Sequence, residues 1–340
     1  MLRKASNLNE LLETCPYNGN IIDSFVKAWS VVNNSDNKKL ICNVSGGSDS
    51  DIMLDLIWRV DINNKVDYVW FDTGMEYQAT KDHLKELKAK YGINISTQKA
   101  KIPVPAGCRK YGLPFVSKRV SEMIHRLQAH GFLWEDGDFG ALLAKYPNCK
   151  SALKWWCNEN SRILNIENNA YLKEFMMLNP PTFSISNMCC HYAKKEVGNS
   201  IVRKSNYQVR IEGIRKAEGG QRSFRYKSCF SANTKAGCDD YRPLFWYTNK
   251  DKAEYEKNYG IVHSKCYSEY GLKRTGCSGC PFGKGFEDEL STIKVYEPKL
   301  FKAATYVFND SYEYTRRYRE FVKKLKEENQ TEGGKIFESD

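Results

Sequence analysis

A short run of serine, glycine and aspartate after an apolar segment limits the fold of this chain more than any other feature. The run follows Leu40–Val44 and precedes Ile52–Ile57, so the pattern predicts a strand, a tight glycine loop and a helix. Two adjacent glycines let a ligand approach the backbone closely, and a helix N-terminus carries about half a positive charge. We therefore expect phosphate to bind in this loop. Its residues are Ser45, Gly46, Gly47, Ser48, Asp49 and Ser50.

The segments around the loop predict a parallel sheet. Val66–Phe71, Ile93–Thr97 and Tyr207–Ile214 suit further strands, and the apolar residues of Thr80–Tyr91 have helical spacing. This alternation of strands and helices favours an α/β fold, in which a parallel sheet has helices on both faces. The glycine loop would then lie at the carboxyl end of a strand, where such sheets bind ligands.

The chain divides into three regions by pattern. Residues 1–100 and 207–250 are predicted to form the α/β domain. The pattern of residues 101–206 is irregular and mostly helical, which indicates an insertion or lid, and this region carries an adjacent pair of cysteines. Residues 251–340 are expected to hold a cysteine-rich segment followed by a long charged helix over Ser311–Glu328.

The composition limits the partners and the compartment. The 340 residues include 52 Lys and Arg against 41 Asp and Glu, a formal net charge of +11, which favours anionic ligands. The basic residues are spread along the chain, so they do not single out nucleic acid. The sequence has no run of about 18 apolar residues and begins without the apolar core of a signal peptide. We therefore expect no membrane partner and a cytoplasmic location.

Twelve cysteines are many for a chain expected in the cytoplasm, where disulfides are rare. The adjacent Cys189 and Cys190, together with Cys277 and Cys280 of a Cys-x-x-Cys segment, supply four thiolates. Four thiolates suit a [4Fe–4S] cluster or structural zinc. Zinc is more often held by two spaced Cys-x-x-Cys segments, so the adjacent pair favours iron–sulfur, and zinc is the alternative. The other cysteines are expected to be packed thiols.

Two more segments place polar residues where strands end. Asp72 and Thr73 close the second strand, while Gly213 and Arg215 follow the late strand, with Arg222 seven residues further on. Guanidinium groups suit phosphate or sulfate because they donate two parallel hydrogen bonds. We therefore expect Arg215 first, and Arg222 second, to neutralise an anion.

These motifs resemble those of a known superfamily. The pattern Ser-Gly-Gly-x-Asp-Ser after a first strand is similar to the PP-loop of the ATP pyrophosphatases, the adenine nucleotide alpha-hydrolase superfamily. The segments beginning at Asp72 and Gly213, the segment Arg242–Thr248 and the Cys-Cys…Cys-x-x-Cys pattern resemble its phosphoadenosine phosphosulfate (PAPS) reductase branch. The resemblance implies a Rossmann-like, HUP-type sheet whose loop holds the pyrophosphate of ATP with Mg²⁺.

The resemblance also implies roles for individual residues. It implies catalytic roles for Asp49 and Arg215. The implied nucleotide contacts are Ser45, Gly46, Gly47, Ser48, Asp49, Ser50, Phe71, Asp72, Thr73, Gly213, Arg215 and Arg222. The implied ligands of a [4Fe–4S] cluster are Cys189, Cys190, Cys277 and Cys280.

One departure from that branch bears on the reaction. PAPS and adenylyl-sulfate (APS) reductases attack sulfur with a cysteine in a C-terminal Glu-Cys-Gly-Leu-His segment, whereas this sequence has no cysteine after Cys280. Such attack requires a thiolate nucleophile. The loop is also intact here, while sulfonucleotide reductases usually carry a degenerate version. ATP is therefore the expected nucleotide.

Three functions follow as hypotheses. The first is an ATP-dependent enzyme that adenylates an unidentified acceptor, releases pyrophosphate and inserts sulfur from a donor. The acceptor could be a small molecule, a carrier-bound intermediate or nucleic acid, and the enzyme could be a homodimer. The second is reduction of PAPS or APS with a cysteine from elsewhere in the chain. The third is a nucleotide-binding module without turnover, belonging to a nucleic-acid-modifying or defence complex.

Overall fold

The chain forms two compact units in a computed structural model. The first unit contains Met1–Lys101 and Tyr192–Ser278, and the second contains Ile102–His191 and Gly279–Asp340. Within them the structure describes residues 3–33, 38–160, 164–219, 225–283 and 285–335. Arg222, one of the predicted anion ligands, lies outside the described residues.

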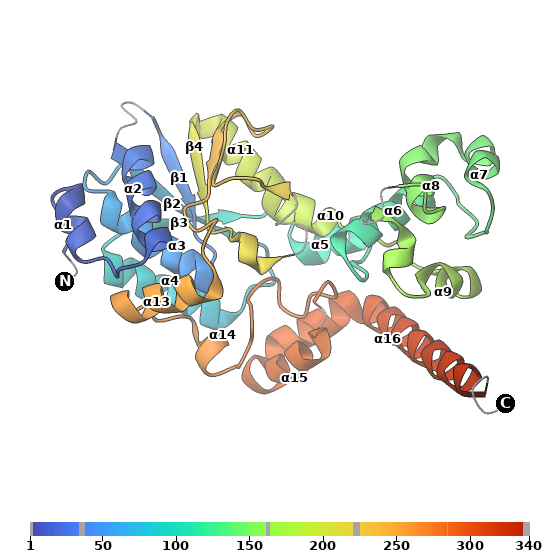
Figure 1. Ribbon diagram of the computed structural model, residues 1–340. Helices are drawn as coiled ribbons and strands as arrows, with labels where there is room; N and C mark the ends of the chain where they lie inside the picture. The colour runs from blue at the N-terminus through green and yellow to red at the C-terminus, as the bar shows by residue number, and fades with distance from the viewer. Residues whose placement is uncertain (1–2, 34–37, 161–163, 220–224, 284, 336–340) are drawn as a thin grey trace. The chain divides into compact units, whose positions relative to one another are not determined.

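The first unit is built on a six-stranded sheet of order β3-β2-β1-β4-β6-β5 (Figure 1). Every neighbouring pair is parallel except β5 with β6. Leu40 at the start of β1 pairs with Val66 of β2 on one side and with Val209 of β4 on the other. The strands are β1 (Leu40–Asn43), β2 (Val66–Asp72), β3 (Ile95–Lys99), β4 (Val209–Glu212), β5 (Phe230–Ser231) and β6 (Asp239–Tyr241).

Helices cover both faces of this sheet, as alternation along its strands requires. On β1, Leu40 and Cys42 enter the main core with α2, α3, α4 and α13, while Ile41 faces the other way, toward Val202 of α11. The predicted Rossmann-like α/β fold, with a mostly parallel sheet and helices on both faces, is thus confirmed. The α-helices of this unit are α1 (Leu8–Glu13), α2 (Gly19–Asn33), α3 (Ser48–Val60), α4 (Gln78–Tyr91), α11 (Glu196–Ser205), α13 (Asn249–Tyr259) and α14 (Lys265–Ser268).

The second unit is helical. Its core gathers aromatic side chains, and Tyr314 of the last helix lies 5.0 Å, ring centroid to ring centroid, from Phe175. Tyr314, Tyr318 and Phe321 fall at helical spacing and pack on this core. The helix itself starts earlier than predicted, at Pro298, because proline suits a first helical turn. The helices are α5 (Val104–Tyr111), α6 (Lys118–Gln128), α7 (Phe139–Lys145), α8 (Lys150–Trp156), α9 (Leu172–Leu178), α10 (Met188–Cys190), α15 (Phe286–Tyr296) and α16 (Pro298–Lys335).

The two units divide the chain differently from the three predicted regions. Residues 192–206, which the pattern assigned to the insertion, belong to the first unit because α11 packs Val202 against the sheet. Residues 251–278 also belong there, since Tyr255 of α13 is buried in the main core. Among the described helices, none combines the length and the apolar composition needed to cross a membrane.

Candidate functional site

The candidate site of the first unit lies where three adjacent strands end. β2, β1 and β4 are neighbours and parallel, so their carboxyl ends lie at one edge of the sheet. The loop 44–47 follows β1, the turn 73–77 follows β2, and residues 213–215 follow β4. This edge is where parallel sheets bind ligands, and it brings together three of the predicted motifs.

The loop after β1 depends on its glycines. Gly46 has φ +68°, and a Cβ placed there would lie 2.8 Å from Thr80 Cγ2, so both conformation and space exclude a side chain. A Cβ on Gly47 would lie 3.2 Å from Thr275 Oγ1. The loop then leads directly into α3, whose first turn contains Asp49 and Asp51. A backbone this close to its surroundings can present N–H groups to a ligand.

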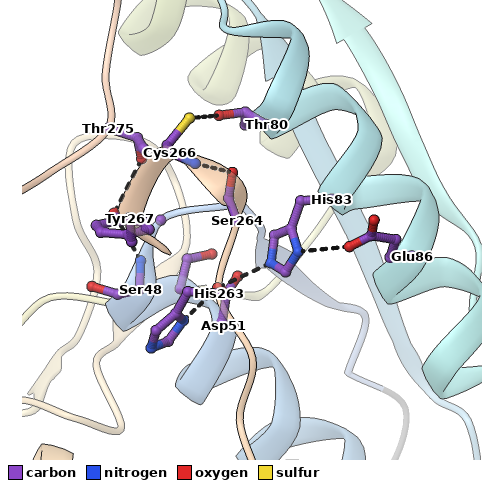
Figure 2. A network of polar contacts seen from close by, with 12 residues as sticks. Ser48, Asp51, Thr80, His83, Glu86, His263, Ser264, Cys266, Tyr267 and Thr275 are labelled. Atoms are coloured by element: carbon purple, nitrogen blue, oxygen red, sulfur yellow. Dashed lines mark hydrogen bonds and ion pairs between the residues drawn. The ribbon is translucent and has the colours of Figure 1, made fainter. Parts of the chain in front are cut away.

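Hydroxyl groups accept hydrogen bonds from two backbone N–H groups of the loop. Ser45 N donates to Ser50 Oγ at 2.8 Å. Ser48 N donates to the hydroxyl of Tyr267 at 3.0 Å, and that hydroxyl lies 3.3 Å from Thr275 Oγ1 (Figure 2). The N–H groups of Ser45 and Ser48 therefore donate to hydroxyl oxygens of the protein itself.

Two cations meet one carboxylate beside the loop. Asp49 Oδ1 lies 2.9 Å from Arg215 Nε and 2.8 Å from Lys252 Nζ. Arg215 is 6% exposed, and its Nη1 donates to Asn249 Oδ1 at 3.1 Å. Its Nε forms an ion pair with Asp49 without the geometry of a hydrogen bond. The result is a buried guanidinium next to the start of α3, with hydrogen-bonding capacity left for an anion.

Gly213 allows this approach. A Cβ at Gly213 would lie 3.1 Å from the carbonyl oxygen of Asp49 and 3.3 Å from Ser50 Cα. The end of β4 therefore passes close to the first turn of α3, and two residues later Arg215 reaches Asp49. The structure thus brings together the glycine loop and the Gly-Ile-Arg segment, which are more than 160 residues apart in the sequence.

The turn after β2 is held by its own side chains. Asp72 Oδ1 accepts a hydrogen bond from Gly74 N at 2.9 Å, and Thr73 Oγ1 donates to Glu76 Oε1 at 2.5 Å. Burial raises the pKa of Glu76, although Lys194 and the hydrogen bond from Thr73 lower it. Phe71, one residue earlier, lies 3.7 Å from the position that a Cβ on Gly198 would take. Asp72 and Thr73 therefore shape this turn in the described structure.

A buried polar network lies below the loop (Figure 2). Asp51 Oδ2 lies 3.1 Å from His83 Nε2 and 2.8 Å from His263 Nδ1. The other nitrogen of His263, Nε2, lies 2.8 Å from Glu256 Oε1. Burial lowers the pKa of His263, but the hydrogen bonds to Asp51 and Glu256 outweigh it and raise the pKa to about 9. His263 is therefore a cation between two carboxylates at neutral pH.

The predicted cluster ligands are divided between the units. Cys277 belongs to the first unit, where its Sγ lies 3.5 Å from Thr73 Oγ1, while Cys189, Cys190 and Cys280 belong to the second. In the second unit the backbone of α5 approaches α10 closely, because a Cβ on Gly107 would lie 3.3 Å from Cys189 Cα. The neighbouring Cys108 thereby becomes a hydrogen-bond partner of Cys189. Within the described residues, no group of three or more His, Cys, Asp or Glu side chains is arranged to hold a metal ion.

Sequence reasoning missed several residues at this edge. Lys252, His263 and Tyr267 all reach α3 or its loop, yet they lie more than 200 residues further along the chain. The histidines showed no metal-like or triad-like spacing in the sequence, and Asp51 joins His83 to His263 only through the fold. One signal was available: the segment Arg242–Thr248, which resembles an element of the PAPS reductase branch, ends directly before α13, and Thr248 caps that helix.

The fold and the site define an α/β domain with a glycine loop at the carboxyl edge of its parallel strands. Residues 39–131 match the family model of the phosphoadenosine phosphosulfate reductase domain. The match confirms, for this part of the chain, the predicted resemblance to the PAPS reductase domain. A comparison with curated proteins found no match.

Solved structures with a similar arrangement have low sequence identity. PAPS reductase from Candida auris is 13% identical with a TM-score of 0.41, covering 82% of this chain and 97% of its own. The U34-tRNA thiolase NcsA from Methanococcus maripaludis, with its [4Fe–4S] cluster, is 12% identical with a TM-score of 0.39, covering 89% and 80%. NH3-dependent NAD synthetase from Campylobacter jejuni is 12% identical with a TM-score of 0.36, covering 92% and 96%.

Proposed function

We propose that the first unit binds ATP in the loop Ser45–Ser50 and transfers AMP to an acceptor, which then receives sulfur. The acceptor oxygen attacks the α-phosphorus, the bond to the β-phosphate breaks, and pyrophosphate leaves. Sulfide from a donor then attacks the activated carbon and displaces AMP. The intact Ser-Gly-Gly-x-Asp-Ser loop in a PAPS reductase domain supports this reaction class.

One observation carries the proposal: a buried guanidinium, Arg215, lies against the first turn of α3, directly after a glycine loop. A buried cation is costly unless an anion is present to pair with it. Asp49 supplies one negative charge, and a nucleotide polyphosphate supplies more. The helix N-terminus adds to the attraction for an anion at the same place.

The residues of the chain have separate tasks in this reaction. The N–H groups of the loop stabilise negative charge that grows on the departing pyrophosphate. Arg215 neutralises phosphate, and Asp49 aligns Arg215 with the loop through their ion pair. Because Asp49 Oδ1 already faces two cations, Mg²⁺ is expected to arrive bound to the triphosphate, not to Asp49 first. Phe71, Asp72, Thr73 and Gly213 are proposed to flank the nucleoside.

The second part of the proposal is a [4Fe–4S] cluster on Cys189, Cys190, Cys277 and Cys280. The donor chemistry fits, since thiolates hold such clusters, and Cys189 and Cys190 are adjacent in α10 with Cys280 in the same unit. Such a cluster can carry sulfide or electrons when it is bound. Four thiolates also suit zinc, which is the alternative metal.

Binding and turnover separate the hypotheses. Calorimetry of the anaerobically purified protein should show ATP binding, and Arg215→Gln should weaken it at least tenfold. Arg203→Gln, which changes an exposed arginine of α11 in the same unit, should leave it unchanged. Incubation of α-labelled ATP with the protein and small-molecule or RNA fractions of a cell extract should give AMP and pyrophosphate in one fraction. An absence of adenine nucleotide binding would overturn the proposal.

Sulfonucleotide reduction is the second candidate, favoured by the match of residues 39–131 to the PAPS reductase domain. It requires a thiolate nucleophile and a reductant such as thioredoxin. Release of sulfite from PAPS or APS with thioredoxin would support it. If the protein turns over ATP but neither PAPS nor APS, sulfonucleotide reduction is excluded. If the protein binds ATP but forms no AMP with any of the fractions, it would instead be a binding module within a larger complex.

A further inference from the structure

We infer that Lys252 is a polyphosphate-binding residue that selects a nucleoside 5′-triphosphate over a nucleoside 5′-phosphosulfate. This inference rests on the proposed nucleotide site. It concerns a residue outside the glycine loop and the Gly-Ile-Arg segment, on the helix α13. It also commits the site to one class of nucleotide.

The geometry places the ammonium group at the mouth of the loop. Lys252 Nζ donates to Ser48 Oγ at 2.5 Å and lies 2.8 Å from Asp49 Oδ1. Both partners belong to the first turn of α3, where the terminal phosphates of a nucleotide held by the loop would lie. The side chain of Lys252 is 18% exposed, so it lies near the surface and not in the core.

The helix α13 holds Lys252 in this position. Thr248 caps the helix: Asp251 N donates to Thr248 Oγ1 at 3.2 Å, and Thr248 N donates to Asp251 Oδ2 at 2.8 Å. Asp251 is held in turn by Asn18 and Asn20 of the α2 region, each at 2.9 Å. A helix that is capped and held at its first turn keeps the start of the lysine side chain fixed, while its ammonium group can turn to a new partner.

The acids around Lys252 do not depend on it. Asp49 keeps Arg215 at 2.9 Å. Glu256, which lies 3.7 Å from Lys252 Nζ, keeps His263 at 2.8 Å. Lys252 can therefore turn toward a phosphate without leaving a carboxylate unpaired, and its replacement should not unfold the unit.

Charge decides which nucleotide this second cation suits. A terminal phosphate loses a second proton near neutral pH, whereas a terminal sulfate carries a single negative charge. A triphosphate also carries two phosphate groups beyond the α-phosphate, where a phosphosulfate carries only the sulfate. Arg215 alone can neutralise a phosphosulfate, but a triphosphate gains from a second cation at the same loop.

The test compares ATP, APS and AMP on the full-length protein by calorimetry. Lys252→Gln should weaken ATP binding about 10- to 100-fold, the range for a lost charge-assisted hydrogen bond, and leave AMP affinity within about twofold. Lys252→Arg should restore most of the ATP affinity. Lys257→Gln, which changes an exposed lysine of the same helix, should alter none of the three affinities. Wild-type protein should prefer ATP to APS, and Lys252→Gln should reduce that preference.

The outcomes distinguish this inference from the proposed function. If wild-type protein binds no adenine nucleotide, the nucleotide site itself is wrong. If wild-type protein binds ATP and Lys252→Gln binds it equally well, the site stands and the inference about Lys252 is overturned. An equal loss for ATP and AMP, or a lower melting temperature of Lys252→Gln without ligand, would show that the lysine acts through the structure.

Discussion

Gly46 illustrates how one residue permits the close packing of the loop. Its φ of +68° lies in the left-handed region, and its missing side chain leaves room for Thr80 of α4. The loop can therefore sit tightly between the end of β1 and a neighbouring helix. Because backbone conformation and space both exclude a Cβ, the effects of a substitution should add.

A substitution at Gly46 should cost more than one at a glycine with the same backbone. Gly46→Ala should lower the free energy of unfolding by about 2–5 kcal/mol, since the left-handed conformation costs about 1–2 kcal/mol and overpacking about 1–3 kcal/mol. Gly260→Ala is the matched control, because Gly260 has φ +59° and no atom within 4 Å of its Cβ position. Urea titration of both variants checks this. Equal losses would show that contact with Thr80 contributes nothing.

His263 should make stability depend on pH in the alkaline range. Its pKa is raised to about 9 by Asp51 and Glu256 against the effect of burial, while an unfolded histidine titrates near about 6.5. The folded state binds the proton more tightly, so this contribution is complete below about pH 6.5 and is lost as the pH rises through about 9.

Unfolding at a series of pH values tests this sign. The free-energy difference between wild type and His263→Gln should be largest near about pH 6 and should shrink toward about pH 10. Taking the difference removes the titration of cysteines and other groups common to both proteins. His130→Gln, at an exposed histidine, should give a difference that does not change with pH. A difference for His263 that grows with pH would contradict its charged state.

At the scale of elements, Asp55 joins three helices of the first unit. The carboxylate lies in α3, is fully buried, and pairs with Arg59 Nε at 2.6 Å. It also accepts hydrogen bonds from Tyr91 of α4 at 2.9 Å and Tyr255 of α13 at 2.8 Å. Since α3 begins at the glycine loop and α13 carries Lys252, Asp55 fixes the helices that position both.

Removing this carboxylate should be strongly destabilising. Asp55→Ala leaves a mostly buried guanidinium and two tyrosine hydroxyls without their partner, which should cost about 3–5 kcal/mol. Asp23→Ala is the matched control, because Asp23 and Lys27 form an exposed pair with the same i,i+4 spacing at 2.6 Å. That variant should lose about 0.5 kcal/mol or less. Similar losses in denaturant titrations would contradict the role given to Asp55.

The sequence could predict those elements whose determining residues are close neighbours along the chain. The strand, glycine loop and helix over 40–60 have their signals within one short stretch, and Gly92 ends α4 in the left-handed conformation as its position suggested. β5 and β6 escaped prediction because they contain two and three residues, too few for an alternating pattern. The contacts of Lys252 and Tyr267 could not be predicted, because only the fold brings these residues close to the glycine loop and the start of α3.

At the scale of the whole molecule, the predicted cluster ligands come from both units. Cys189, Cys190 and Cys280 belong to the helical unit and Cys277 to the sheet unit. Sequence spacing identified these residues, but it did not single out Cys108, which the packing of α5 on α10 makes a partner of Cys189. The metal content of the purified protein tests the cluster assignment directly.

Metal analysis of anaerobically purified protein makes that measurement. Wild type should contain about four iron atoms per chain and absorb near ~400 nm, and Cys189→Ser should lose most of the iron. Cys149→Ser, which alters another buried cysteine of the helical unit, should keep it. A colourless protein that contains zinc would replace the iron–sulfur assignment, and equal iron in both variants would remove Cys189 from the ligands.

The contact between Tyr267 and Ser48 has a consequence for events at the loop. The phenol oxygen of Tyr267 accepts a hydrogen bond from Ser48 N, and it also lies 3.3 Å from Thr275 Oγ1, two residues before Cys277. A phosphate that accepts a hydrogen bond from Ser48 N would displace the hydroxyl of Tyr267. Tyr267 could then also move away from Thr275. Nucleotide binding at the loop would thus shift the segment around Thr275, which leads into the Cys-x-x-Cys segment.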